Sequence, residues 1–266
     1  MKDTRDLNRT SKTFVRAKWA GGPGAADPAR RSRRGLGDPS VASAAARVSV
    51  HFDGIEDVFV GLCRRYEVVV GAVAWLTNSA ILSALAEPEH VAIVVQKEDF
   101  LRPDAGFATY PGQRRETRAL YDSLRPFEAE DFKETHPGQQ EFHPDYNGAV
   151  QDWLFDNKGT YQQGGEAVRC MGYAGDPAGR ATPRMHHKFL VFGHKCRDLV
   201  MAPSCVVTGS FNLTHNATRS RENVLVVEDR DICHAYLSEW AQLWGMSEPL
   251  DWSCPEPSPE RMYVGT

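Results

Sequence analysis

Hydrophobic and polar positions follow regular patterns over two parts of this 266-residue chain. Runs rich in β-branched residues, such as EVVVGAVAWL at 67–76, are typical of buried strands, whereas IEDVFVGLCRR at 55–65 places its apolar residues at helical spacing. Strands that alternate with helices predict an α/β fold with a largely parallel or mixed sheet. The sequence predicts strands at 46–52, 67–76, 90–96, 166–173, 186–192, 203–209 and 223–228.

Helices are predicted between these strands from apolar spacing and from capping residues. Asn78 precedes the helical run at 78–88 and is a suitable N-cap, and a short helix is expected after Thr214. The other predicted helices lie at 55–65, 113–124, 148–156 and 230–244.

The regular pattern is interrupted between residues 100 and 165. This segment holds 11 of the 26 aromatic residues together with Pro and Gly, which predicts an aromatic-rich insertion with its own small core. The same aromatic residues could instead offer stacking faces to unpaired bases. We therefore divide the chain into a flexible arm at 1–46, a catalytic domain at 47–250 that contains the insertion, and a loose tail at 251–266.

Composition places the chain in the soluble globular class. No apolar run approaches the length of a membrane span, and the N-terminus lacks a secretory signal, so we expect a cytoplasmic protein without a membrane span. Six cysteines without a CxxC pair favour reduced thiols over disulfides. A zinc site at His194, Cys196 and Cys205 is the alternative to a simple hairpin, and the hairpin is preferred.

Charge is distributed unevenly along the chain. Residues 1–50 hold eleven basic against four acidic residues, a net of +7, and the remaining 216 residues hold 20 against 31, a net of −11. Because the residues after position 50 are acidic overall, attraction to nucleic acid must come from a local groove or from the basic arm. Arg31, Arg33 and Arg34 in the arm are candidate phosphate contacts, and a solvated flexible tail is the alternative interpretation.

The segment RMHHKFLVF, at 184–192, carries polar residues at the start of a predicted strand. Because side chains alternate along a strand, His186 and Lys188 point to one face and His187 to the other. An imidazole beside a fixed cation suits chemistry on a phosphate. A polar pair at a strand edge can also serve solubility alone.

A second polar cluster follows the strand that ends in VVTG. Ser210 and Asn212 could donate to phosphate oxygens, and Thr208 and Gly209 are candidate substrate contacts in the same turn, although such turns also begin ordinary helices. Glu222 precedes the next strand, where a carboxylate needs a partner such as an imidazole N–H.

Taken together, MHHKFLVF, TGSFNLTHNA and the Glu-Asn pair resemble the phospholipase D superfamily, the HKD phosphodiesterases. The resemblance covers residues 47–96 and 165–245 and is closest to the bacterial nuclease branch with one motif per chain. It implies a phospholipase D-like mixed sheet with helices on both faces. It also implies a homodimer that shares one active site, with no cofactor and no metal.

Two departures from the family pattern concern the loop between the motifs. Gly193 stands where the family has Asp, with Asp198 as the nearest replacement, and Lys188 and Gly209 are 21 positions apart instead of 12. In this family the Asp is thought to act in structural support, so its absence leaves the phosphorus chemistry in place and raises the alternative of an inactive copy.

The resemblance implies a two-step displacement at a phosphodiester. His186 would attack phosphorus, a second protonated histidine from a partner subunit would serve the leaving oxygen, and Lys188, Ser210 and Asn212 would hold the nonbridging oxygens. Glu222 would accept the Nδ1 proton of His186. We expect a metal-independent nuclease for DNA or RNA. The alternatives are a phospholipid phosphodiesterase or phosphatidyltransferase, and an inactive nucleic-acid-binding homologue.

Overall fold

The computed structural model describes residues 41–43, 47–98, 111–127, 166–174, 182–196, 199–245 and 247–258. The predicted helix at 148–156 and the arginines of the arm lie outside these residues. The strands of the described part are β1 (Val41–Ser43), β2 (Val48–His51), β3 (Val68–Val73), β4 (His90–Gln96), β5 (Val168–Met171), β6 (Lys188–Cys196), β7 (Leu199–Gly209) and β8 (Val224–Val227).

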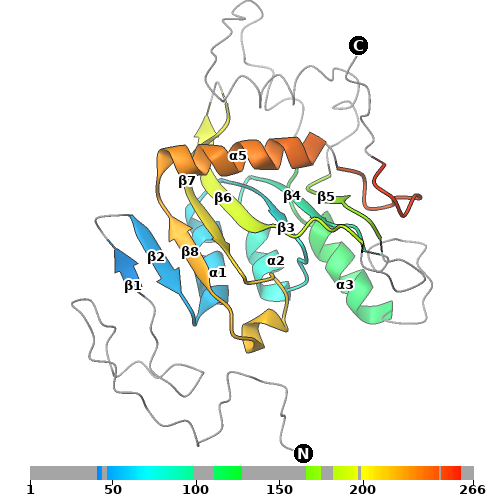
Figure 1. Cartoon of the computed structure of the whole chain (residues 1–266), viewed down its shortest axis with the longest axis horizontal. Helices are drawn as coiled ribbons and strands as arrows, with labels where there is room; N and C mark the ends of the chain where they lie inside the picture. The colour runs from blue at the N-terminus through cyan, green and yellow to red at the C-terminus, as the bar shows by residue number, and fades with distance from the viewer. Residues whose placement is uncertain are drawn as a thin grey trace, which may run out of the picture.

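Within the described residues the strands form one eight-stranded sheet in the order β1-β2-β8-β7-β6-β3-β4-β5 (Figure 1). β3, β4 and β5 run parallel, and the other neighbouring pairs are antiparallel, which confirms the predicted mixed sheet. The sheet begins inside the segment that the sequence analysis set apart as an arm, because Val41–Ser43 add an edge strand to β2.

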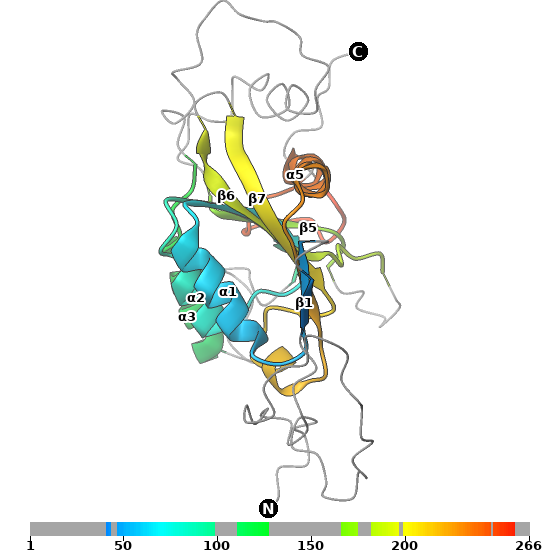
Figure 2. The ribbon, with the colours of Figure 1, turned by 90° about the vertical axis from the view of Figure 1, so that its left-hand side faces the viewer.

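Helices cover both faces of the sheet, as the resemblance implied (Figure 2). α1, α2 and α3 lie on one face and α5 lies on the other. The predicted cap is present, since Asn78 Oδ1 accepts a hydrogen bond of 3.0 Å from the amide of Ile81. The bounds are α1 (Ile55–Arg65), α2 (Ser79–Leu85), α3 (Pro111–Asp122) and α5 (Arg230–Gly245), and the short helix expected after Thr214 is a 3-10 turn, η3 (Ala217–Arg219).

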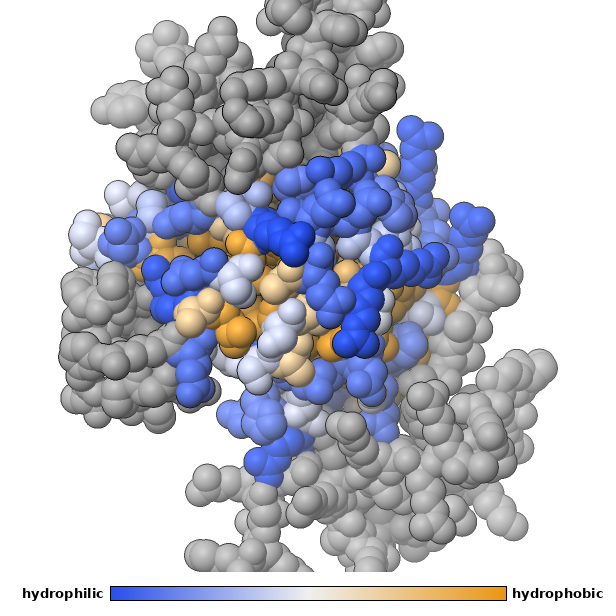
Figure 3. All heavy atoms as spheres, turned by 180° about the vertical axis from the view of Figure 1, so that it is seen from behind, coloured by the Kyte–Doolittle hydropathy of each residue, from blue (hydrophilic) through white to orange (hydrophobic). Residues whose placement is uncertain are grey.

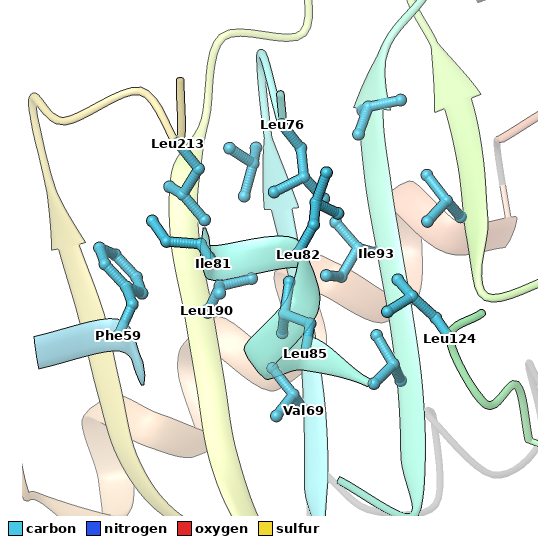
Figure 4. Close-up of a cluster of buried hydrophobic side chains, with 14 of the residues drawn as sticks. Phe59, Val69, Leu76, Ile81, Leu82, Leu85, Ile93, Leu124, Leu190 and Leu213 are labelled. Carbon is cyan, nitrogen blue, oxygen red and sulfur yellow. The ribbon is translucent and has the colours of Figure 1, made fainter. Parts of the chain in front are cut away.

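The central strands are buried on both faces. Every residue of β3 and β4 is buried, which explains why their sequences are nearly continuous apolar runs. On the α1–α3 face, leucine and isoleucine side chains of α2 pack against Val69, Ile93 and Leu190 (Figure 4). On the other face, Leu237 and Trp240 of α5 join a second cluster.

The surface over α1, α2 and α3 is mainly hydrophilic. Figure 3 shows blue residues over most of the described area, with apolar residues toward its middle. Among the described residues, Ile232 is the one large hydrophobic side chain that is exposed. None of the described helices has the length and hydrophobicity needed to cross a membrane.

Two aromatic residues of the predicted insertion belong to the main core. Tyr121 is buried in the cluster on the α1–α3 face and donates a 2.6 Å hydrogen bond to the carbonyl of Leu76. Phe127 packs in the cluster on the α5 face, with its ring stacked 4.9 Å from that of His90. The structure therefore corrects the expectation of a separate core for this part of the segment, because α3 packs directly on the domain.

The first residues of the predicted tail also pack on the domain. Lys97, which is 0% exposed, donates to Glu248 Oε1 at 2.6 Å and to the carbonyls of Cys254 and Glu256 at 2.9 and 2.8 Å. The indole ring of Trp252 lies 5.0 Å from the same ammonium. Because three carbonyl or carboxylate oxygens satisfy the three donors of one buried lysine, residues 248–256 are attached to the end of β4.

Candidate active site

The predicted site residues meet at one end of the central strands, where β3 and β7 end and β6 and β8 begin. Val73, the last residue of β3, pairs with Lys188, the first residue of β6. Gly209, the last residue of β7, pairs with Val224, the first residue of β8. This arrangement gathers the His-x-Lys pair, the Gly-Ser-x-Asn turn and Glu222 from three separate stretches of chain.

His186 and Lys188 contact each other at the accessible start of β6. Lys188 Nζ lies 3.2 Å from each ring nitrogen of His186 and donates a 3.0 Å hydrogen bond to its carbonyl oxygen. The backbone is anchored nearby, since the amide of Ala74 donates to the carbonyl of His187 at 2.8 Å. The pair shares a face, as the alternation of the strand predicted.

The environment of His186 favours the neutral imidazole. Desolvation lowers the pKa of His186 first, and the charges of Lys188, Arg184 and His187 lower it further. Desolvation also lowers the pKa of Lys188, and the carboxylate of Glu222 opposes that shift. A lowered pKa means that His186 loses its proton at a lower pH than an ordinary histidine, so its lone pair is available near neutral pH.

Removing one of these charges should raise the pKa of His186. In Arg184→Gln we expect the NMR titration of the His186 ring to move to higher pH while staying below the ordinary histidine value, because desolvation remains the largest cause. Arg64→Gln is the matched control, since Arg64 lies on α1 and pairs with Glu87. An unchanged or lowered pKa in Arg184→Gln would contradict this electrostatic account.

Ser210 and Glu222 form a direct pair across the turn. Ser210 Oγ donates a short hydrogen bond to the Glu222 carboxylate and accepts a 3.1 Å bond from the amide of Asn223. The amide of Ser210 in turn donates to the carbonyl of Asn223 at 3.1 Å. Glu222 is thus tied to Ser210 and, through charge, to Lys188. Its expected hydrogen bond with His186 Nδ1 stays a prediction.

Thr208 and Gly209 are predicted substrate contacts, and both lie at the end of β7. Thr208 pairs with Phe189, whose side chain lies in the core on the α5 face, so Thr208 points to that face and away from Lys188. A Cβ on Gly209 would lie 2.1 Å from the carbonyl oxygen of Asn223. The glycine is therefore required for the close approach of β7 and β8.

Asn212, three residues after the end of β7, has a side-chain amide that can donate to a ligand. Its Oδ1 is buried and has no hydrogen-bond partner within the described part of the chain, while its carbonyl accepts a 2.7 Å bond from the amide of Thr214. The other end of the side-chain amide, Nδ2, is a donor that suits a phosphate oxygen. The structure does not describe the remaining candidates, Arg31, Arg33 and Arg34.

Three residues beside the site were missed from the sequence. The ring of Trp75 lies 5.5 Å from that of His186 and 5.9 Å from Lys188 Nζ. Glu98 accepts hydrogen bonds from the Trp75 indole at 3.0 Å and from Arg184 at 3.1 Å. The alternation of Arg184, His186 and Lys188 was a usable signal for the arginine. Trp75 and Glu98 follow different strands, so only the fold brings them to the histidine.

Gln96 holds the segment that leads into His186. Its side chain accepts a 2.7 Å hydrogen bond from the amide of Met185 and donates to the carbonyls of Lys97 and Tyr173 at 2.9 and 2.7 Å. Gly172 permits this arrangement, since it has φ +98° and a Cβ there would lie 2.6 Å from Gln96 Oε1. The residue before the histidine is therefore fixed by a buried amide.

Loss of the Trp75 ring should impair the site moderately. A cation–π contact and an aromatic neighbour contribute about 1 kcal/mol, so Trp75→Ala should lower kcat/KM several-fold. Trp75→Phe keeps an aromatic ring but loses the indole N–H that donates to Glu98. Its kcat/KM should therefore lie between those of the wild type and Trp75→Ala. Wild-type kinetics in Trp75→Ala would show that the ring has no part in positioning His186 or Lys188.

Gly193, at the family's Asp position, lies far from the pair of His186 and Lys188. It pairs with Val68 at the other end of β3, five residues and therefore about 17 Å along the strand from Lys188. A Cβ on Gly193 would lie 2.2 Å from the carbonyl oxygen of Ala202, where β6 and β7 have a register shift. The β6–β7 hairpin accommodates the longer spacing between the motifs at this distal end.

Restoring the family's aspartate should therefore harm the protein. Gly193→Asp is expected to lower the free energy of unfolding by about 3 kcal/mol or more, because it adds a clash and a buried carboxylate. Gly61→Ala is a suitable control, since its Cβ meets nothing within 4 Å on α1 and should be neutral or stabilising. Urea unfolding measures both, and a stable, more active Gly193→Asp would contradict this reading of the strand.

The described residues contain no group of three or more His, Cys, Asp or Glu side chains that could hold a metal ion. His194 and Cys205, two of the three ligands of the zinc alternative, have other surroundings. The ring of His194 packs 5.2 Å from that of Tyr66, and burial raises the pKa of Cys205 to about 12.

Comparison with known proteins identifies relatives for most of this region. The model of a family described as "Cardiolipin synthase, PLD-like domain" matches residues 72–244, a range that contains every predicted catalytic residue. Uncharacterized protein L381 of Acanthamoeba polyphaga mimivirus is 27% identical over 205 residues, 76% of this chain and 66% of that protein. The mitochondrial cardiolipin hydrolase of Xenopus tropicalis is 39% identical over 69 residues, 26% of this chain and 29% of that protein.

Solved structures of low sequence identity also align with the chain. NucT from Helicobacter pylori aligns with a TM-score of 0.40 and 14% identity, covering 76% of this chain and 98% of that one. Nuc from Salmonella typhimurium, a phospholipase D family member, aligns with a TM-score of 0.38 and 14% identity, covering 76% and 95%. The chain spans just under two thirds of the length of the viral relative and less than a third of the cardiolipin hydrolase.

Proposed function

This chain belongs to the phospholipase D-like family, and from that premise we propose that it is a nuclease that cleaves phosphodiesters through a phosphohistidine. One observation carries the proposal. The imidazole of His186 is accessible, is held toward its neutral form and lies 3.2 Å from the ammonium of Lys188. A neutral nucleophile beside a fixed cation is what attack on an anionic phosphorus requires.

In the first step, a ring nitrogen of His186 bonds to phosphorus as the bond from phosphorus to the leaving oxygen breaks. A second, protonated imidazole gives its proton to that oxygen. In the second step, the same imidazole takes a proton from water, the hydroxide bonds to phosphorus and the bond to His186 breaks. Lys188 and Asn212 would offset the charge on the nonbridging oxygens, and the Ser210–Glu222 pair borders the same site.

The second imidazole is proposed to come from another copy of the chain. His187, the neighbour in sequence, lies on the opposite face, where its Nε2 is 3.1 Å from Glu239 of α5. A two-fold dimer would place two His186 rings at one interface. Mixing wild-type chains with His186→Ala chains should then give crippled mixed dimers. Full activity in a demonstrated monomer would exclude a shared site.

Nucleic acid is the preferred substrate. The net charge of +7 over residues 1–50 supports attraction to a polyanion. A phospholipid is the second candidate, because the matched family and the hydrolase from Xenopus tropicalis carry cardiolipin in their names.

A substrate panel separates these possibilities. The full chain is incubated with single- and double-stranded DNA, RNA and cardiolipin-containing liposomes, each with excess EDTA. The proposal expects cleavage of a nucleic acid that survives the chelator. Lipid turnover alone would assign the second candidate, and tight nucleic-acid binding without turnover would indicate an inactive homologue.

A further inference from the structure

A hollow lies at the end of the sheet opposite the His186–Lys188 pair. It has a volume of about 400 Å³ and is lined chiefly by Arg47, Arg65, Tyr66, His194, Glu228 and Arg230. His194 is six residues along β6 from Lys188, which is about 20 Å in a strand. The catalytic residues therefore do not contribute to this hollow, which we call the distal cavity.

Three arginines line the distal cavity and make it cationic. Within the described residues, Arg47, Arg65 and Arg230 form no salt bridge, and the Arg65 guanidinium stacks 5.1 Å from the ring centre of Tyr66. Other arginines nearby have carboxylate partners, as Arg64 does with Glu87 at 3.4 Å. Three guanidinium groups around one hollow, in a chain of net charge −4, form a site for an anion, and phosphate suits their planar donors.

The backbone at one of these arginines is strained. Arg47 has φ +49° and is the one described residue other than glycine in the left-handed region. Its carbonyl accepts a 2.9 Å hydrogen bond from the amide of Glu228, which fixes Arg47 beside another residue that lines the cavity. Strained conformations of this kind concentrate at ligand sites.

The other lining groups indicate more than a simple anion. Glu228 is an acceptor inside a cationic hollow, which suits hydroxyl groups and disfavours an anion without donors. The side chain of His194 is 51% exposed, and its ring is held by Tyr66 behind it and by Glu67 at 3.6 Å. A fixed, half-exposed ring offers a face on which a base can stack.

From these groups we propose that the distal cavity binds a nucleoside phosphate. The arginines bind the phosphate, Glu228 accepts hydrogen bonds from the ribose hydroxyls, and the base lies against His194. The volume of about 400 Å³ falls in the range of small-molecule sites. The inference does not depend on the proposed nuclease activity, because no catalytic residue takes part in it.

Calorimetric titration of the full chain with AMP, ADP and inorganic phosphate tests the inference. We expect saturable binding of AMP or ADP, with inorganic phosphate at least about tenfold weaker, since it lacks the ribose and base contacts. The double variant Arg65→Gln, Arg230→Gln should weaken nucleotide binding by at least about tenfold, the loss of about 1.4 kcal/mol of charged contacts. Arg64→Gln, with its neighbouring charge outside the cavity, should bind as the wild type does.

Glu228→Gln separates a nucleotide site from a general anion site. It should weaken AMP several-fold and leave inorganic phosphate unchanged or tighter, because only the nucleotide uses the carboxylate as an acceptor. Circular dichroism confirms that each variant is folded. Absence of saturable nucleotide binding, or binding unchanged in the double arginine variant, overturns the proposal. So does binding of an oligonucleotide or of anionic lipid vesicles at this cavity without binding of mononucleotides.

Discussion

Replacing His186 with alanine is expected to lower kcat/KM for phosphodiester cleavage by about 10³-fold or more, because the variant loses the proposed nucleophile and its proton transfers together. The ring is also the group that Lys188 and Trp75 surround, at 3.2 Å and 5.5 Å. The measurement uses the nucleic acid that the substrate panel identifies, with EDTA present. Rapid denaturation at alkaline pH, where the N–P bond is stable, should trap a phosphohistidine in the wild type and none in the variant.

His187→Ala is the matched control for this experiment. It removes the same side chain one position along, where the strand points to α5 and the ring pairs with Glu239 on the surface. Its activity should stay close to that of the wild type. An equal loss in both variants would refute the assignment of His186 as the nucleophile and would indicate a general effect on the start of β6.

Replacing Lys97 with methionine is expected to lower the free energy of unfolding by about 3–5 kcal/mol. The ammonium is fully buried and pairs with Glu248 at 2.6 Å, so its removal leaves a carboxylate and two carbonyls, those of Cys254 and Glu256, without their cation. The cost of an unpaired buried charge exceeds what the apolar methionine recovers. Urea unfolding followed by circular dichroism measures the change.

Lys195→Met is the matched control for Lys97→Met. Lys195 pairs with Glu89 at 2.8 Å, but both side chains are about half exposed, so the change should cost about 0–1 kcal/mol. Adding Glu248→Leu to Lys97→Met should recover part of the lost stability, since it removes the stranded carboxylate. A cost for Lys97→Met as small as that of the control would contradict the burial of this pair.

Lys97 also connects the stability of the fold to the candidate active site. Its neighbour Glu98 accepts hydrogen bonds from Trp75 and Arg184, and Gln96 on its other side holds the amide of Met185. The three residues at the end of β4 thus attach the C-terminal segment, fix Trp75 and fix the chain before His186. Loosening this end of β4 should therefore lower activity as well as stability.

Local features of the fold were predictable from the sequence. The buried runs of β3 and β4 and the cap at Asn78 appear where the pattern of side chains placed them. Alternation likewise assigned His186 and Lys188 to one face and His187 to the other, and their contacts agree. These features depend on residues a few positions apart, for which backbone geometry alone sets the direction of each side chain.

Other features could not be read from the sequence. Tyr121 and Phe127 were grouped with a separate insertion, and the structure places them in the main core. The C-terminal residues were expected to be loose, because nothing near Lys97 in sequence indicates that its partners lie more than a hundred positions away.

By itself the sequence determined the α/β class, the strands and their faces, and the phospholipase D-like motif, because each rests on short-range periodicity and spacing. Only the tertiary structure decided that Trp75 and Glu98 border His186, that Gly193 lies at the distal end of β6, and that Arg47, Arg65 and Arg230 surround one cavity. These contacts follow from strand order and register, which depend on packing over the whole sheet.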